Sequence, residues 1–453
     1  MPIVDAVTGI LCQAGEVYMV RRHRELSAFP GYQAFPGGKV DVPDADHVYQ
    51  PGTHFDQSPR LFRALMRELE EELGVRWSFA APGVPRDHCI ERCILMGTAL
   101  TPPHSVMRFN THFFRLDLSE RPTFTLETRE HDSGGWATPQ LWMERYRQGE
   151  ILLAPPTLMA LRALAADPAA ETIPFDDFRG EVGDGVPVLE AQYGVKMLMV
   201  RSNTIPPAQF TNCFLIGDAG ASRLLIDPSP RNDEELKRLR HTADRLGFDE
   251  IFITHHHPDH QQLADALARA TGKPIGMSAD TQARIRARSP RFFDGLDLRT
   301  HADGDVVSSW NGHPVRVMAV PGHDEGQLAL MPDNRAWCIV SDLIQGIGTV
   351  VISAPEGDMR KYFASLERVI AAQPAVIYPS HGIGLGGTYY LEQTLRHRRL
   401  REAQIKQLAD AGRSIDDMLA EIYREVDAFL LPLARANIES HLRKLREDAA
   451  TAA

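Results

Sequence analysis

Short apolar runs separated by polar loops dominate the hydrophobic pattern of the chain, and a few longer stretches have helical periodicity. Near the start, alternating apolar residues at 6–11 and 17–20 predict two strands joined by a turn at 14–15. Residues 59–73 carry leucine at four positions spaced by four, which predicts an amphipathic helix that ends at Gly74.

In the second half, short strands are followed closely by helices. Strands are expected near 195–200, 213–216 and 224–226, and the run 251–254 predicts another strand, with a helix over 263–270 soon after it. Strands and helices that alternate in this way suggest two sheets packed as a sandwich, with helices on the outer faces.

The spacing of these elements divides the chain into parts. A chain of 453 residues exceeds what one hydrophobic core supports. Residues 167–190 are rich in proline, glycine and acids, which is typical of a linker. We therefore expect a first domain at 1–166, a second at 191–390 and a helical segment at 391–453. The fold class is α/β and α+β multidomain.

Composition limits the class of protein and the cellular compartment that we expect. A hydrophobic fraction of 43% is ordinary for a globular protein, and a net charge of −11 argues against a wholly electrostatic nucleic-acid binder. The five cysteines are scattered and odd in number, so packing in a reducing compartment is expected rather than a disulfide framework. Residues 1–16 do not resemble a signal peptide, and no run approaches ~18 apolar residues. We expect a cytoplasmic protein with no membrane partner.

The densest chemistry lies in the stretch 254–260, Thr-His-His-His-Pro-Asp-His. Alternate side chains of an extended segment share a face, so His255 and His257 can hold one cation. Asp259 and His260, past the bend, can reach a second cation. Neutral imidazole and carboxylate are the ligands that suit zinc.

Three more donors follow short apolar runs later in the chain. They are His323, Asp342 and His381. A solvated His-rich loop, or a purely structural metal clip, would not require such distant partners. The pattern therefore favours a functional metal site over either alternative.

These positions resemble the HxHxDH signature and the later donors of the metallo-β-lactamase-fold hydrolases, over about residues 195–390. The resemblance implies an αββα sandwich with two cations, zinc or else iron or manganese. The implied roles are a first metal on His255, His257 and His323, a second on Asp259, His260 and His381, Asp342 as the bridge between them, and Asp227 as a support behind the ligands.

The same resemblance implies a dinuclear hydrolase in which a metal-bound hydroxide attacks an ester, thioester or phosphodiester, with Asp259 in the catalytic set. Several positions depart from the usual pattern and bear on the shape of the pocket. They are Gln262 and Leu263 in place of a glycine pair, Asp324 and Gln327 in place of small hydroxyl residues, and Pro228 and Ser229 in place of a Thr-Gly pair.

The helix predicted at 59–73 carries a second chemical signal. Glu68, Glu71 and Glu72 are related by i, i+3 and i+4, which stacks three carboxylates on one helix face. Such a face is often only charged and solvated. Like charges at this spacing oppose each other unless a cation lies among them.

The run from Arg67 to Val75 resembles the core of the Nudix box, REUxEExGU, with a Gly-Gly pair upstream. The resemblance implies an α/β/α Nudix domain that uses Mg²⁺ or Mn²⁺ to hydrolyse a nucleotide or coenzyme A diphosphate. Its metal ligands would be Glu68, Glu71 and Glu72, the last two also catalytic, and Arg67 would orient a carboxylate. An insertion at about 41–58 breaks the usual spacing and leaves Asp41 and Asp44 as substitutes for a missing glutamate.

The third segment contains a cationic run at 396–401. Arg398 and Arg401 are candidate substrate contacts, although such a run more often faces solvent. Within the metallo-β-lactamase family, this segment resembles the β-lactamase-like endoribonuclease branch, whose C-terminal cap is winged-helix-like. Here we expect the helices of that cap without its β wing, and a capping box at Ser414 and Asp417.

Three functions remain open at this point. The first is a metal-dependent hydrolase of the endoribonuclease or glyoxalase II-like branch, with RNA or a small-molecule ester or thioester, such as a glutathione conjugate, as substrate. The second makes the Nudix half the main enzyme, with the other half auxiliary. The third is a non-catalytic binding module. The complete set of seven donors argues against it, because an inactive module has no need for them. The resemblance also allows a homodimer.

Overall fold

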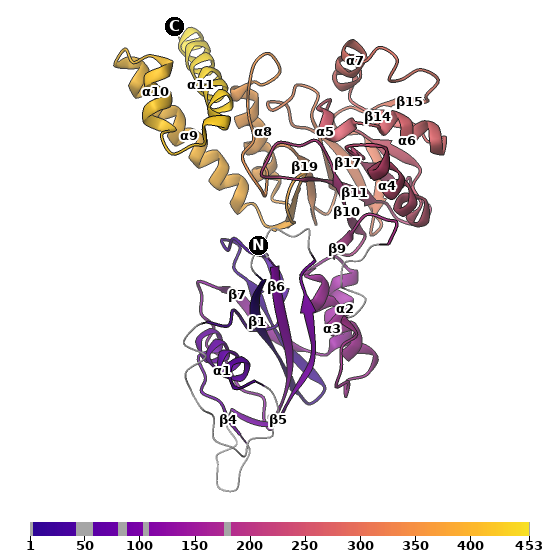
Figure 1. Ribbon diagram of the computed structural model, residues 1–453, viewed down its shortest axis with the longest axis vertical. Helices are drawn as coiled ribbons and strands as arrows, with labels where there is room; N and C mark the ends of the chain where they lie inside the picture. The colour runs from indigo at the N-terminus through magenta and orange to yellow at the C-terminus, as the bar shows by residue number, and fades with distance from the viewer. Residues whose placement is uncertain (1–2, 42–57, 80–87, 103–107, 176–182, 453) are drawn as a thin grey trace. The chain divides into compact units, whose positions relative to one another are not determined.

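The computed structural model describes residues 3–41, 58–79, 88–102, 108–175 and 183–452 (Figure 1). The candidate substitute Asp44 lies outside these ranges. By internal contacts the chain divides into unit 1, Met1–Gly183 with Ala191–Tyr193, and unit 2, Asp184–Glu190 with Gly194–Ala453. The helical segment predicted as a third part belongs to unit 2.

Eight strands in the described part of unit 1 form one sheet of order β4-β5-β6-β1-β2-β3-β8, with β7 paired to β2. The strands are β1 (Ile3–Gln13), β2 (Glu16–Arg22), β3 (Tyr32–Ala34), β4 (Ser78–Phe79), β5 (Cys89–Leu100), β6 (Arg108–Leu118), β7 (His131–Ala137) and β8 (Leu152–Leu153). The helices are α1 (Pro59–Leu73), α2 (Pro139–Arg147) and α3 (Pro155–Ala166). Helix α1 lies on one side of the sheet, and α2 and α3 lie on the other (Figure 1).

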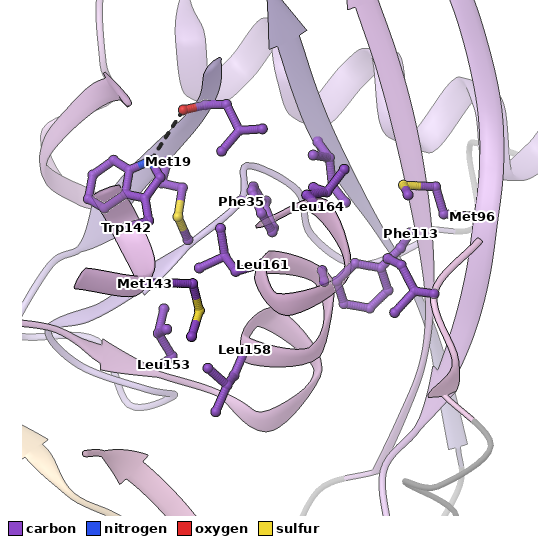
Figure 2. Close-up of a cluster of buried hydrophobic side chains, with 14 of the residues drawn as sticks. Met19, Phe35, Met96, Phe113, Trp142, Met143, Leu153, Leu158, Leu161 and Leu164 are labelled. Atoms are coloured by element: carbon purple, nitrogen blue, oxygen red, sulfur yellow. Dashed lines mark hydrogen bonds between the residues drawn. The ribbon is translucent and has the colours of Figure 1, made fainter. Parts of the chain in front are cut away.

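Alternation along β1 explains why helices cover both faces. Val7 and Leu11 pack in the core beneath α1, whereas Ile10 packs in the core beneath α2 and α3. Figure 2 shows this second core, where the Trp142 indole Nε1 donates a hydrogen bond to the Val17 carbonyl at 3.3 Å. The apolar stripe of α1 is confirmed, with Leu65, Leu69 and Leu73 all fully buried.

The two signals that bounded these elements are also confirmed. The turn at Ala14 and Gly15 has φ values of 49° and 79°, in the left-handed region. Gly74 ends α1 with φ 68° and donates its N–H to the Glu70 carbonyl.

Two sheets form the core of unit 2 among its described residues, with the orders β15-β14-β13-β12-β11-β10-β9 and β16-β17-β18-β19-β20-β21. The first contains β9 (Val188–Gln192), β10 (Val195–Arg201), β11 (Phe210–Ile216), β12 (Leu224–Ile226), β13 (Glu250–Phe252), β14 (Ile275–Met277) and β15 (Leu298–Thr300). The second contains β16 (Val306–Trp310), β17 (His313–Ala319), β18 (Leu328–Pro332), β19 (Cys338–Ser341), β20 (Val376–Pro379) and β21 (Leu385–Gly386).

Helices cover the outer face of each sheet. The helices on the first sheet are α4 (Asp233–Leu246), α6 (Ala264–Thr271) and α7 (Ala279–Arg288), and they share one buried core with β10 to β14. The second sheet packs against α8 (Met359–Ala372) and α9 (Tyr389–Asp410). Phe214 on β11 meets Tyr378 on β20 edge-on, with ring centroids 5.7 Å apart. The predicted two-sheet sandwich with outer helices is therefore confirmed.

The C-terminal helices of unit 2 are α9, α10 (Ile415–Ile422) and α11 (Leu431–Ala452), with a 3-10 turn at Ala428–Leu430. They share a small core centred on Ile405, Met418 and Ile438. The capping box at Ser414 and Asp417 is confirmed. No strand occurs among the described residues after Gly386, and the likeness to a winged helix stays a prediction.

Two further features concern the cysteines and the helices. All five cysteines are free and buried, which confirms that they pack and form no disulfide. Among the described residues, no helix is both long and apolar enough to cross a membrane.

Candidate metal centre

The ends of four strands bring the candidate donors of unit 2 together. The stretch with His255 follows β13, and α5 (Pro258–Gln261) begins three residues later, which turns the chain around the donors. His323 follows β17, Asp342 follows β19 and His381 follows β20. Strands of two sheets thus deliver donors from distant parts of the sequence to one place.

The structure brings all seven candidate donors into three overlapping groups, in each of which the donor atoms lie within 4.8 Å of one another. The groups are His255, His257 and His323; His255, His260 and Asp342; and Asp259, His260 and His381. In the first group, His257 Nδ1 lies 2.9 Å from both His255 Nε2 and His323 Nε2. Imidazole nitrogens that converge at such short distances form the kind of site that holds a cation.

Asp342 lies between the groups. Its Oδ2 is 3.8 Å from His323 Nε2, and its Oδ1 is 3.6 Å from the Nε2 atoms of both His260 and His381. One carboxylate therefore faces both halves of the site, in the place that the resemblance gives to a bridging ligand.

Hydrogen bonds fix the orientation of the imidazoles by their other nitrogens. His260 Nδ1 donates to Asp227 Oδ2 at 2.8 Å, His323 Nδ1 to the Val351 carbonyl at 2.9 Å, and His381 Nδ1 to the Phe210 carbonyl at 2.8 Å. Such bonds fix the tautomer and aim the free nitrogen at the metal. Asp227 occupies the supporting position that the resemblance implies, since it also accepts hydrogen bonds from the N–H and hydroxyl of Thr254.

Two atoms in the cluster test its fit to a cation. His260 Nε2 and Asp342 Oδ1 are buried and have no hydrogen-bond partner among the described residues. Buried polar atoms are seldom left in this state without a ligand. A divalent cation among these nitrogens and carboxylates would satisfy both.

The charges of the site are strongly coupled. Burial and the neighbouring imidazoles lower the pKa of His323 to about 4. Burial alone would raise the pKa of Asp342, but His260 and His381 outweigh it and hold that pKa below its usual range. The cluster therefore favours a neutral imidazole at His323 and an ionised carboxylate at Asp342, which are the ligand forms that metals bind.

Glu356 is a residue that the sequence did not single out. It accepts hydrogen bonds from His257 Nε2 at 3.2 Å and His256 Nε2 at 3.0 Å, and the bond from His257 lowers its pKa to about 2. His256 is buried, and its Nδ1 pairs with Asp324. The sequence offered one signal for the contact between His256 and Asp324. Asp324 directly follows His323, and a carboxylate that is buried there requires a hydrogen-bond partner.

The departure at Leu263 has a visible backbone consequence. Leu263 adopts φ 59°, in the left-handed region that favours glycine. The usual glycine at this place fits that conformation, and this chain accommodates a half-buried leucine instead.

The two candidate substrate contacts in the cationic run serve the fold. Arg398 is buried and donates to the Val350 carbonyl and to Asn437 Oδ1. The Arg401 guanidinium lies 4.8 Å from the centre of the Tyr423 ring. These contacts give both side chains a structural role, and substrate contact by either stays a prediction.

The loop that Arg398 contacts at Val350 also contacts one of the candidate metal ligands. Asn437 and Ser440 of α11 hydrogen-bond the two backbone groups of Ile352, and the neighbouring Val351 carbonyl receives His323. The C-terminal helices therefore hold the loop that orients one candidate ligand.

In unit 1, the glutamate helix does not present its carboxylates as one group. Arg67 Nη1 donates to Glu68 Oε1 at 2.9 Å and to Glu71 Oε2 at 3.2 Å. Burial raises the pKa of Glu68 to about 7. Glu72 is buried on the sheet side, where it accepts the Gly37 N–H, and among the described residues its donor group is completed by Glu130 and His131.

Comparisons with known proteins agree with this geometry in unit 2. Residues 206–381 match the family model of the metallo-beta-lactamase superfamily. The chain therefore contains a metallo-β-lactamase superfamily domain, and all seven candidate donors lie in the matched region.

The chain is also similar to two curated relatives and to one solved structure. Beta-lactamase-like protein 2 homolog of Drosophila melanogaster is 29% identical over 53% of this chain and 83% of its own length. A hydroxyacylglutathione hydrolase of Cereibacter sphaeroides is 30% identical over 38% of this chain and 62% of its own length. A NUDIX hydrolase structure from Alicyclobacillus acidocaldarius superposes with a TM-score of 0.32 and 26% identity, over 38% of this chain and 95% of that one.

We predict that Glu356→Gln weakens metal binding about 10- to 100-fold, because the amide loses the charge that holds His257 and His256. Competition of the metal-loaded protein with a chelator measures this affinity. Glu325→Gln, at an exposed glutamate paired with Lys361, is the matched control and should leave the affinity unchanged. Equal affinities in the two variants would contradict the role given to Glu356.

We predict that Arg398→Gln destabilises unit 2 by about 1–3 kcal/mol, since it leaves a buried carbonyl and amide with poorer partners. Denaturant unfolding followed by circular dichroism measures the loss. Arg399→Gln, at an exposed arginine paired with Glu367, should cost less than about 1 kcal/mol. A variant of Arg398 with native stability and only a raised KM would instead favour direct substrate contact.

Proposed function

We propose that unit 2 is a dinuclear-metal hydrolase that cleaves a thioester or related ester of a small molecule. The observation that carries this proposal is the seven-donor cluster with Asp342 facing both halves. The roles of the individual ligands are part of the proposal.

The donor set also bears on the metals. Imidazole nitrogens with carboxylates suit zinc, and equally iron or manganese, better than magnesium or calcium. Two such cations, when bound, lower the pKa of a water molecule toward neutrality and polarise the carbonyl under attack.

The protein's own groups set the geometry of that reaction. Asp227, Val351 and Phe210 hold three imidazoles in place. At the rim, the Gln345 amide donates to Asp342 Oδ2 at 3.3 Å, and the Thr204 hydroxyl lies 3.5 Å from His381 Nε2. These two side chains are placed to position a substrate oxygen.

Water is the nucleophile that the described residues favour. Burial raises the pKa of Cys338 to about 12, and the pKa of Cys213 lies well above its usual value for the same reason. Neither thiol forms a thiolate near neutral pH, so neither is suited to attack a carbonyl.

Two observations support a thioester over RNA. Hydroxyacylglutathione hydrolases are among the relatives, and another relative is an atrochrysone carboxyl ACP thioesterase of Claviceps purpurea, 25% identical over 60% of this chain. Arg398 and Arg401, the cationic side chains that were candidate substrate contacts, both have structural partners. The assay of the proposed activity therefore uses both substrates.

We also propose that unit 1 is a Nudix domain that hydrolyses a diphosphate with Mg²⁺ or Mn²⁺. The sheet between α1 and the pair α2 and α3, together with Arg67 bound to Glu68 and Glu71, supports this second activity. A cytoplasmic location, in keeping with five free thiols, and a homodimer stay predictions.

We predict that Asp259→Ala lowers hydrolysis of a glutathione thioester at least about 100-fold, because a candidate ligand of one cation is lost. Steady-state assays of zinc-loaded protein beside a short single-stranded RNA measure the two activities. Asp244→Ala, at an exposed aspartate on α4, should behave as the wild type. RNA cleavage without thioester turnover would overturn the substrate choice, and silence on both would overturn the hydrolase.

We predict that Glu71→Gln removes at least about 99% of Mg²⁺-dependent diphosphate hydrolysis and leaves thioester turnover unchanged, since the glutamate serves only unit 1. Phosphate release from nucleotide and coenzyme A diphosphates measures the first activity. Glu70→Gln is the control, because Glu70 is exposed and pairs with Arg76. Full diphosphatase activity in Glu71→Gln would exclude the proposed site.

A further inference from the structure

A donor cluster in unit 1 includes a histidine outside the glutamate helix. Glu72, Glu130 and His131 place one donor atom each within 4.8 Å of the others. His131 and Glu72 are buried, whereas Glu130 is exposed, so the cluster has one open side.

The fold holds this cluster in place from three segments. Glu72 lies in the last turn of α1, and the Gly37 N–H donates to its Oε2 at 3.0 Å. The Glu127 N–H bonds the Glu72 carbonyl, and the Glu127 carbonyl receives the N–H groups of Glu130 and His131. The backbone therefore brings the start of β7 against the end of α1.

The state of the His131 ring points to a ligand. The side chain is 1% exposed, and neither ring nitrogen has a hydrogen-bond partner among the described residues. Its Nε2 lies 3.3 Å from Glu72 Oε2, on the side where the cluster gathers. A buried imidazole that faces a carboxylate and has no hydrogen-bond partner is suited to hold a cation together with that carboxylate.

The charge around the cluster leaves room for a cation. Arg22 is near enough to Glu72 and Glu130 to interact electrostatically with both. Its single positive charge compensates one of the two carboxylates. One negative charge remains beside the open side of the cluster.

We propose that Glu72, Glu130 and His131 hold a transition-metal ion of the manganese, iron or cobalt class, with His131 as a nitrogen ligand. The inference rests on the proposal that the glutamate helix binds a divalent cation. It adds that one position in unit 1 discriminates against magnesium, because Mg²⁺ strongly prefers oxygen ligands and imidazole suits the later metals.

The test is a Mn²⁺ titration of the full chain followed by electron paramagnetic resonance, with modulation from ¹⁴N read on the bound ion. His131→Gln should weaken one Mn²⁺ site at least 10-fold and remove its share of the nitrogen modulation. Excess Mg²⁺ should then displace that Mn²⁺ more readily than in the wild type. Unit 2 contributes equally to both proteins and cancels in the comparison.

His112→Gln is the matched control, because His112 is another unit 1 histidine, paired with Thr98 and Asn110, outside the cluster. Glu130→Gln tests the same site at an exposed residue and should also weaken it, so a His131 variant that fails to fold leaves the proposal testable. Titrations of His131→Gln and Glu130→Gln that superimpose on the wild type would overturn it.

Diphosphate turnover with Mg²⁺ separates this inference from the proposed function of unit 1. Diphosphate turnover in the wild type, together with unchanged Mn²⁺ titrations of His131→Gln and Glu130→Gln, would contradict the nitrogen ligand and support the Nudix activity. A Mn²⁺ site that depends on His131, without any diphosphate turnover, would do the reverse.

Discussion

The candidate metal centre depends on hydrogen bonds that fix the second nitrogen of its imidazoles. Asp227, the Val351 carbonyl and the Phe210 carbonyl each receive one ring N–H. Each bond leaves the opposite nitrogen aimed at the cluster, so the site is arranged before any cation arrives. Without these hydrogen bonds, the buried imidazoles would rotate toward other partners, and any that became protonated would repel one another.

The rest of unit 2 is arranged to keep those acceptors in place. Asp227 is held by Thr254 at the end of β13, and Phe210 begins β11. Val351 lies in a loop that α9 and α11 secure through Arg398 and Asn437. The C-terminal helices, far from the His-rich motif in sequence, thereby contribute to the same site as the strands.

Much of this arrangement could be predicted from the sequence, because its signals are local. The apolar stripe of α1, its glycine end and the strand before His255 each depend on residues close in the chain. The seven donors of unit 2 could be named because four lie together in the stretch 254–260, just after a strand, and the other three follow short apolar runs. Their convergence in one place is the part that the family likeness supplied.

What could not be predicted depends on contacts between distant segments. Glu356 meets His257 from 99 residues away, and His131 reaches Glu72 through pairing of β7 with β2. The burial of Arg398 could not be predicted, because its partner includes a backbone carbonyl that the sequence does not reveal. A cationic run without visible acidic partners is normally interpreted as a solvated helix face. Side-chain burial by a later helix leaves no mark on the local pattern.

The central claim is that two cations lie in the seven-donor cluster of unit 2. Anomalous diffraction at the metal absorption edge, from crystals of metal-loaded protein, tests it most directly. We expect two peaks about 3.5–4 Å apart. One should lie among His255, His257 and His323, the other among Asp259, His260 and His381, with Asp342 between them. A single peak, or peaks outside this cluster, would contradict it.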